Sequence, residues 1–400
     1  MKHVHRAGWF APRYPRGPFR RGTVTLSRRP ASLFPMDADA WLVRLNMVRG
    51  LEPRPLAGLL ARFGSARRAL AAPAEAWREV DGVTADLVAE LRQAARDGPA
   101  DGEVAAAAAA GLSLVARGAA DYPLGLGFLS DPPPLLYVRG ELRPDDALAV
   151  GIVGARRCTH FGLRQAARFA GALAAAGVTI VSGLARGIDG RAHEAALAAG
   201  GRTIAVLGGG LDRIYPPEHR PLAARVAASG ALLSEFPLGA PPLRHHFPRR
   251  NRIIAGLGWG LLVVEAAGRS GSLITARLAM EAGREVFAVP GPVDSELSAG
   301  AHQLIRDGAS LVESPGEILE DLGLAPASGE PVGPPAPPAP QHPVARRVLA
   351  AFPETGEPLH PDQIVAATDL DVADVLAACA TLTLVGHHDE EPGGRFRRAR

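Results

Sequence analysis

The sequence predicts an α/β protein with a doubly wound, mostly parallel sheet, preceded by a small all-α domain and followed by a winged-helix-like domain. From about residue 148, short continuous apolar runs alternate with helical segments, and a glycine-rich turn follows most of the runs. Strands buried on both faces have this apolar pattern, and intervening helices give parallel neighbours. The arrangement is Rossmann-like, and we assign it to residues 111–324. The predicted strands are 148–153, 178–181, 203–207, 231–233, 261–264 and 285–289.

Residues 37–110 predict the small helical domain, of the SAM or helix-hairpin-helix type. Short helical segments alternate there with glycine-containing breaks at 62–65 and 80–83. Helical hairpins of this type either contact a nucleic-acid backbone through the glycine turn or serve only as packing modules, and the sequence leaves both open. The predicted helices are 41–45, 56–63, 74–80 and 85–95.

Residues 1–36 predict a basic disordered leader, or a mis-assigned start with translation beginning at Met36. Eight Lys and Arg residues precede Met36 without any acidic residue, and no apolar run of signal-peptide length is present. The whole chain has 44 basic and 41 acidic residues, a formal charge of +3, so the chain without the leader is net acidic. Affinity for a polyanion must therefore come from a local patch.

Beyond the parallel sheet, the Pro- and Ala-rich residues 325–343 predict a semi-extended linker, and residues 344–400 predict the winged-helix-like domain. The helix predicted at the DNA-recognition position carries Asp371 and Asp374 but no Lys or Arg. This composition argues against major-groove binding and weakens the hypothesis of a double-stranded DNA regulator. The predicted elements are helices 344–352, 361–367 and 371–381 and strands 382–386 and 395–397.

Cysteine and hydropathy patterns exclude several classes of protein. Cys158 and Cys379 are the only cysteines and have no CxxC spacing or neighbouring His pattern, so we expect neither a disulfide framework nor a metal site. No unbroken apolar stretch approaches the length of about 18 residues that a membrane span requires. The sequence therefore predicts a cytoplasmic protein without a membrane segment.

Glycine-rich turns at 154–156, 182–189, 208–210 and 268–272 follow predicted strands. In a doubly wound sheet such turns meet at the carboxyl edge, where ligands bind, and free N–H groups at helix starts bind anions. None of the turns has the GxGxxG or GxxxxGK[ST] pattern. We therefore expect an anion site without a dinucleotide, ATP or any other cofactor.

The strongest functional signal is the basic segment RHHFPRRNR at 244–252, in a stretch that has no acidic residue between Glu235 and Glu265. We predict a Pro-bounded loop whose guanidinium groups lack counter-charges and bind phosphate oxygens. Phe247 either offers its ring to a nucleotide base or only packs the loop onto the core. These features favour single-stranded nucleic acid as the partner. The four arginines are Arg244, Arg249, Arg250 and Arg252.

Taken in order, the motifs of residues 37–322 resemble the DNA-processing protein A family, also called DprA or Smf. Each motif is weak alone, but the ordered set is specific. Two departures are Ala155, where the family commonly has Ser, and Arg244 with Arg249, near which the family often has Lys. The motifs are VGAR at 153–156, SGLARGID at 182–189, AH at 192–193, YP at 215–216, SE at 234–235, FPRRNRII at 247–254 and SGSLITA at 270–276.

The resemblance implies a non-enzymatic protein that binds single-stranded DNA in a basic pocket of the Rossmann-like domain. It also implies a homodimer formed through that domain, which protects incoming DNA and loads the RecA recombinase in natural transformation and recombination. Together the resemblance, the basic segment and the glycine-rich turns give a predicted set of DNA-binding residues. The set is Gly154, Arg156, Ser182, Gly183, Arg244, Phe247, Arg249, Arg250, Asn251, Gly271 and Ser272.

A rival hypothesis is a nucleotide-processing hydrolase of the phosphoribohydrolase type on the same fold. Glu265 follows a predicted strand and precedes the 268–272 turn, where it would act on a nucleoside monophosphate or only orient the turn. Asp189, His193 and Glu194 superficially suggest an acid–base or metal set. Because no third ligand follows at a defined spacing, we favour a helix cap at Asp189 and a packed His193.

Overall fold

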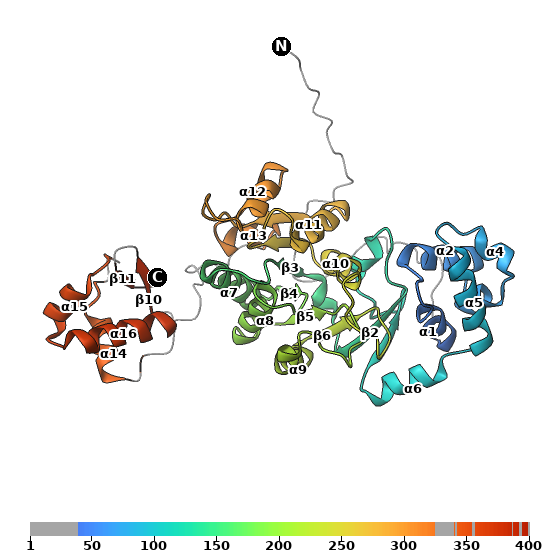
Figure 1. Cartoon of the computed structure of the whole chain (residues 1–400), viewed down its shortest axis with the longest axis horizontal. Coiled ribbons are helices and arrows are strands. Elements are labelled where there is room, and N and C mark those ends of the chain that lie inside the picture. The colour runs from blue at the N-terminus through green and yellow to red at the C-terminus, as the bar shows by residue number, and fades with distance from the viewer. Residues whose placement is uncertain are drawn as a thin grey trace, which may run out of the picture. The chain divides into compact units, whose positions relative to one another are not determined.

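The computed structural model describes residues 39–324, 340, 342–353, 357–385, 387–391 and 394–398. The chain forms two compact units that divide between residues 329 and 330 (Figure 1). The predicted leader and most of the predicted linker lie outside the described residues. No helix within the described ranges is both long enough and apolar enough to cross a membrane.

The first unit is built on a nine-stranded sheet with the order β1-β2-β6-β5-β4-β3-β7-β8-β9. Strands β3 to β9 are mutually parallel, and β1 and β2 extend the β6 edge in antiparallel pairs. The predicted doubly wound, mostly parallel sheet is confirmed. The strands are β1 (Ser113–Ala116), β2 (Leu135–Gly140), β3 (Ala149–Val153), β4 (Thr179–Ser182), β5 (Thr203–Val206), β6 (Ala231–Ser234), β7 (Gly260–Val263), β8 (Glu285–Ala288) and β9 (Ser310–Leu311).

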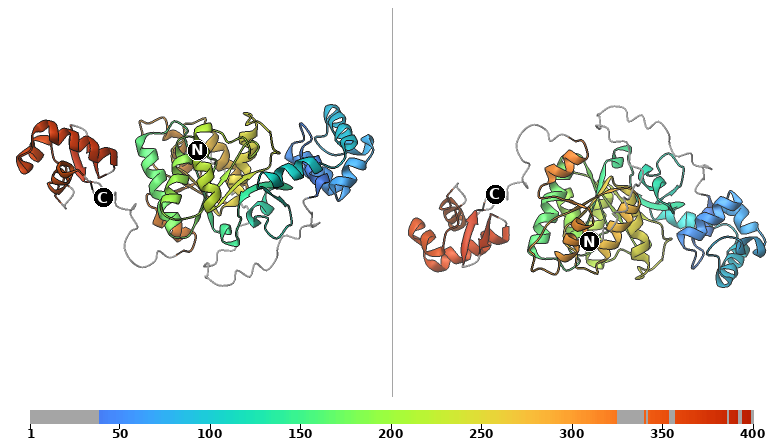
Figure 2. Two further views of the ribbon diagram at one scale, coloured as in Figure 1. Left: turned by 90° about the horizontal axis from the view of Figure 1, so that it is seen from below. Right: turned by 90° about the horizontal axis from the view of Figure 1, so that it is seen from above.

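Helices cover both faces of this sheet (Figure 2). They are α7 (His160–Ala175), α8 (Ile188–Ala198), α9 (Arg220–Ser229), α10 (His246–Leu257), α11 (Gly271–Glu281), α12 (Ala299–Arg306) and α13 (Pro315–Asp321). On one face, α7 and α8 bury Phe169 and Ile188 against Ile152 of β3. On the other, α10 and α11 bury Ile253 and Ala276 with alternate residues of the same strands. Since β3 to β7 are buried along their whole length, their sequences are mostly apolar.

Within the described residues, six helices precede the sheet and share a core with it. They are α1 (Ala40–Asn46), α2 (Pro53–Phe63), α3 (Ala66–Ala71), α4 (Ala74–Arg78), α5 (Ala85–Asp97) and α6 (Asp101–Ala109). The predicted helical segments correspond to α1, α2, α4 and α5, whereas α3 and α6 were not predicted. The break between α2 and α3 forms because Gly64 adopts a left-handed conformation (φ 75°) and Ser65 caps the next helix. Tyr137 of β2 lies in the same buried cluster as Leu45 of α1, so the predicted boundary between residues 110 and 111 stays a prediction.

The second unit has the three helices and two-stranded wing of a winged-helix domain. They are α14 (Pro343–Ala350), α15 (Pro361–Thr368), α16 (Val372–Val385), β10 (His388–Glu391) and β11 (Arg395–Arg398). The predicted wing strand at 382–386 was wrong: residues up to Val385 continue α16, and Gly386 lies outside the described residues. The helix continues because Val375, Cys379 and Leu382, spaced at helical intervals, are all fully buried in one core.

Candidate nucleic-acid interface

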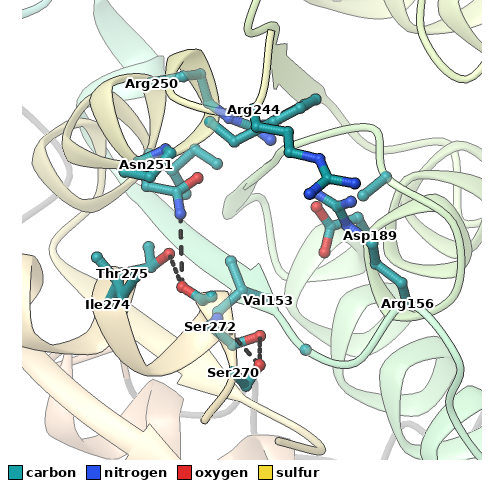
Figure 3. Close-up of a pocket in the computed structure, with 16 residues that line it drawn as sticks. Val153, Arg156, Asp189, Arg244, Arg250, Asn251, Ser270, Ser272, Ile274 and Thr275 are labelled. Carbon is teal, nitrogen blue, oxygen red and sulfur yellow. Dashed lines mark hydrogen bonds between the residues drawn. The ribbon is translucent and has the colours of Figure 1, made fainter. Parts of the chain in front are cut away.

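A cavity of about 510 Å³ lies at the carboxyl edge of the parallel sheet (Figure 3). The strand order reverses between β3 and β7, and Val153 at the end of β3 lines the cavity with the turn that follows β7. This is the position at which open α/β sheets bind ligands. Eight of the predicted site residues line it: Gly154, Arg156, Arg244, Phe247, Arg250, Asn251, Gly271 and Ser272.

The basic segment folds differently from the prediction. A Pro-bounded loop was predicted at 244–252, but α10 begins at His246 and continues to Leu257. Pro248 is tolerated because it stands in the first turn, where a helix makes no use of the backbone N–H. Ile253 and Leu257 bury the far half of the helix in the core. As a result, α10 directs its first two turns, with Phe247 and Arg250, at the cavity.

Phe247 forms a half-buried aromatic wall of the cavity. Its ring packs over the backbone of Gly208, where a Cβ atom would come within 3.3 Å of Phe247 Cδ1. Two guanidinium groups lie over the ring, with Cζ of Arg156 at 5.0 Å and Cζ of Arg250 at 5.9 Å from its centroid. The Tyr215 ring lies 6.1 Å away. The structure thus places a half-buried aromatic ring beside two cations, and such a pairing suits a base and its phosphate.

Arg250 forms the cationic floor of the cavity. Its side chain is only 3% exposed, and Nη1 donates a 2.5 Å hydrogen bond to the carbonyl oxygen of Val206. Burial lowers the pKa of Arg250 to about 10, while the nearby carboxylate of Asp189 opposes this shift. The group therefore remains charged at neutral pH. Gly183 makes room for it, because a Cβ atom there would lie 1.9 Å from Arg250 Nη1.

Arg156 and Arg244 supply cations at the rim of the cavity. Both side chains are exposed, and within the described part of the chain neither forms an ion pair with a carboxylate. Figure 3 shows their guanidinium groups extending toward the same space. An arginine that forms no ion pair within 4 Å can still turn toward phosphate oxygens, which guanidinium groups bind in bidentate geometry.

The first turn of α11 faces the cavity from the β7 side. Ser270 caps the helix by accepting a hydrogen bond from the Ser272 amide at 3.2 Å, and Thr275 Oγ1 donates to the carbonyl of Gly271 (Figure 3). Asn251 Nδ2 lies 3.5 Å from the same carbonyl and joins α10 to this turn. Open backbone N–H groups at a helix start attract anions. The turn therefore places the start of a helix, without a charged side chain of its own, beside the arginines.

Arg249 and Arg252 lie on the side of α10 away from the cavity. The carboxylate of Glu235 is within 3.1 Å of Arg249 Nε and 2.5 Å of Arg252 Nη2, and it is itself only 1% exposed. Arg252 also pairs with Asp131 at 3.3 Å, and Arg249 with Glu52 at 3.9 Å. The prediction that these guanidinium groups lack counter-charges was therefore wrong. Arg249, one of the predicted site residues, is not brought into the cavity.

Ser182 and Gly183 lie behind the cavity wall. Ser182 is fully buried, and its Oγ donates a 2.6 Å hydrogen bond to the Ile152 carbonyl, which joins β4 to β3. The Gly183 amide donates to Asp189 Oδ2 at 3.1 Å. These two predicted site residues hold the floor in place and do not line the cavity.

Two residues of α8 have different surroundings: Asp189 lines the cavity, and His193 is packed in the core. Asp189 lines the cavity, whereas Gly187 occupies the N-cap position, so the predicted cap at Asp189 was wrong. Burial raises the pKa of Asp189, and the charge of Arg250 opposes this effect. His193 is packed as predicted: it is fully buried, and its Nδ1 lies 2.6 Å from Thr203 Oγ1. Within the described ranges no cluster of His, Cys, Asp and Glu side chains could hold a metal ion.

Glu265 serves the start of α7 and does not line the cavity. Its carboxylate accepts hydrogen bonds from Thr159 N at 2.9 Å and Thr159 Oγ1 at 2.5 Å, and Thr159 is the N-cap residue of α7. A Cβ atom on Gly162 would come within 2.3 Å of Glu265 Oε2, so the carboxylate sits directly on the first turn of that helix. This geometry gives Glu265 a helix-capping role.

Several cavity residues were not predicted as site residues, among them Ile274 and Asp189. Ile274 keeps its apolar side chain 42% exposed at the cavity mouth. Both residues belong to the quoted motifs, SGSLITA and SGLARGID, but their residue types gave no reason to select them for binding DNA. A carboxylate repels phosphate, and an isoleucine is most often buried in a core.

Comparison with known proteins identifies the family. Residues 113–323 match the sequence model of the family described as DNA recombination-mediator protein A, and residues 332–394 match that of the DprA winged helix domain. The chain belongs to the DNA recombination-mediator protein A family. The family match and the winged helix confirm the resemblance to DprA and Smf proteins that the sequence motifs indicate.

Members of the family from several bacteria are similar over most of this chain. Protein Smf of Escherichia coli (strain K12) is 47% identical over 290 residues, which cover 70% of this chain and 76% of that protein. A putative DNA processing protein DprA of Mycobacterium tuberculosis is 39% identical over 344 residues, or 85% of this chain and 86% of the relative. The X-ray structure of DNA processing protein A from Streptococcus pneumoniae superimposes with a TM-score of 0.62 at 35% identity, covering 72% of this chain and 98% of that one.

Proposed function

We propose that this protein binds single-stranded DNA in the cavity at the carboxyl edge of the sheet. The observation that carries the proposal is Phe247, a half-buried ring with two guanidinium groups close to it, which lines a cavity that also holds the start of α11. A base must leave its duplex stack to reach such a ring, whereas a single strand presents its bases freely. Phosphates on either side of that base would then meet Arg156, Arg244 and the α11 amides.

We infer from the family's recombination-mediator description that the bound strand is handed to a recombinase. The motif resemblance gives RecA as that recombinase, and a homodimer through the Rossmann-like domain as the acting form. We place the protein in the cytoplasm, acting on incoming DNA during natural transformation and recombination. On this proposal it requires no cofactor and is not an enzyme.

Substituting Arg156 or Arg244 by Ala is expected to weaken binding to all single strands alike. Each variant removes an unpaired guanidinium group, so the slope of log K against log salt should become shallower by about 0.7 for each phosphate that the variant no longer neutralises. Fluorescence anisotropy of a labelled oligonucleotide, titrated at several salt concentrations, measures both the affinity and the slope.

Arg225→Ala is the matched control, because Arg225 is an exposed arginine on α9 that does not line the cavity. It removes the same charge and should leave the salt slope of the wild type. Tighter binding to duplex than to single strands, or equal slopes in all three variants, would show that the strand does not follow this cavity.

The rival hydrolase hypothesis requires a catalytic Glu265, but both of its oxygens already bond Thr159. We expect Glu265→Gln to bind single strands with wild-type affinity and to lose about 1–2 kcal/mol of stability, because the helix start loses its anion. Urea unfolding measures the stability, and incubation with nucleoside monophosphates tests for released base. Release of base by the wild type that disappears in Glu265→Gln would establish the hydrolase instead.

A further inference from the structure

Asp189 is an unexpected residue in a cavity proposed to hold a polyanion. It lines the cavity together with Arg156, Phe247 and Arg250, and Figure 3 shows its carboxylate directed toward the space that the Arg156 guanidinium group also enters. A carboxylate at this place repels phosphate. Binding of the DNA backbone therefore gives no reason for its position.

Contacts within the protein use only part of the hydrogen-bond acceptor capacity of the Asp189 carboxylate. Oδ2 accepts a hydrogen bond from the Gly183 amide at 3.1 Å, and the Ala185 backbone amide also stabilises the charge. Within the described residues the carboxylate forms no ion pair closer than 4 Å, although Arg250 and Arg156 attract it from a greater distance. A carboxylate has about four lone-pair sites, so acceptor capacity remains on the cavity side.

The Phe247 ring and the Asp189 carboxylate are both close to the guanidinium groups of Arg156 and Arg250. The guanidinium groups of Arg156 and Arg250 lie 5.0 and 5.9 Å from the ring centroid, and both attract Asp189. A base stacked on Phe247 would therefore present its hydrogen-bonding edge in the region of Asp189. Proteins that bind single strands read unstacked bases in this way, through an aromatic face and the Watson–Crick edge.

We propose that Asp189 reads the base held against Phe247 and gives the cavity a preference for guanine. This inference rests on the proposed function. A carboxylate only accepts hydrogen bonds, and guanine offers N1–H and an N2 amino group side by side, which match its two oxygens. Thymine places carbonyl oxygens on both sides of its single N–H donor, and those oxygens repel the carboxylate. Adenine and cytosine each offer one amino group and rank between the two.

The test compares short labelled oligonucleotides in fluorescence anisotropy. Each is a dT hexamer in which one central nucleotide is dG, deoxyinosine, dA or dT; inosine lacks only the N2 amino group of guanine. The wild type should bind the dG hexamer on the order of 10-fold more tightly than the dT hexamer, with inosine intermediate. Asp189→Asn keeps an oxygen for the Gly183 amide but adds a donor, so the preference should fall to less than twofold.

Asp294→Asn is the matched control. Asp294 is an exposed carboxylate outside the cavity, so its loss changes the net charge equally and should leave the guanine preference intact.

Equal binding of the dG and dT hexamers by the wild type, or an unchanged preference in Asp189→Asn, overturns the inference. Should Asp189→Asn fail to fold, as thermal melting would show, the wild-type comparison of dG with inosine decides, and a difference below twofold refutes guanine reading. Absence of binding to every hexamer and to longer single strands would refute the proposed function itself.

Discussion

Gly183→Ala is expected to abolish measurable binding to single strands and to lower the free energy of unfolding by about 3 kcal/mol. The new Cβ atom would lie 1.9 Å from Arg250 Nη1 and 2.6 Å from its Cζ atom, so the guanidinium group must leave the cavity floor. It then loses its hydrogen bond to the Val206 carbonyl and its attraction to Asp189. Anisotropy titrations measure the binding, and urea unfolding measures the stability.

Gly268→Ala is the control for this substitution. Gly268 is exposed in the turn before α11, and no atom lies within 4 Å of a Cβ atom built there, so wild-type binding and stability are expected. A double mutant adds a second check, because Gly183→Ala should cost little in a chain that already carries Arg250→Ala. Full additivity of the two substitutions would show that Gly183 acts independently of Arg250.

Glu235→Gln is expected to lower the free energy of unfolding of the first unit by about 3–5 kcal/mol. The substitution keeps the shape of the side chain but leaves two guanidinium groups, those of Arg249 and Arg252, without their buried counter-charge. Single-strand binding should weaken as well, since these pairs fix the orientation of α10. Tryptophan fluorescence during urea unfolding reports this unit, because no tryptophan follows Trp259 in the sequence.

Glu52→Gln is the control for Glu235→Gln, because it removes the same charge from a carboxylate that is exposed. Comparing the two stability losses separates the effect of burial from that of charge. Glu52 pairs with the same Arg249, at 3.9 Å, but its side chain is 58% exposed. Solvent screens such a pair, and the expected loss is below about 1 kcal/mol. Equal losses in Glu235→Gln and Glu52→Gln would mean that the buried carboxylate does not organise α10.

The parallel strands could be predicted from the sequence because burial on both faces leaves a continuous apolar run. All six predicted strands match β3 to β8 to within one residue at each end. Strand β2 was not predicted, although Leu135 to Val138 are fully or nearly fully buried. Three prolines precede it and its partners are antiparallel. It is apolar because Leu135 and Tyr137 pack in the core shared with the N-terminal helices, while Leu136 and Val138 pack in the core on the α10 face.

The candidate site could be predicted only in part, because position in the sequence does not show which way a helical side chain points. Arg249 and Arg250 are adjacent in the chain, yet one pairs with Glu235 and the other forms the cavity floor. The counter-charges came from residues distant in sequence, with Asp131 and Glu52 lying far before α10. A count of charged residues near α10 in the sequence includes neither Asp131 nor Glu52. Gly183 was selected for a turn but proved to matter for the space that it leaves to Arg250.

The contacts on the outer side of α10 bear on how this architecture can change in evolution. Asn46 of α1 donates a hydrogen bond to the Glu235 carbonyl, and Arg249 reaches toward the Leu51 carbonyl before α2. The helix that supplies Phe247 is thus braced by side chains and backbone encoded some 200 positions earlier. A recombination event that exchanged the sheet but not α1 and the segment before α2 would remove the contacts that hold α10 in place. The support of the candidate site therefore extends from α1 through the sheet and includes more of the chain than the Rossmann-like domain alone.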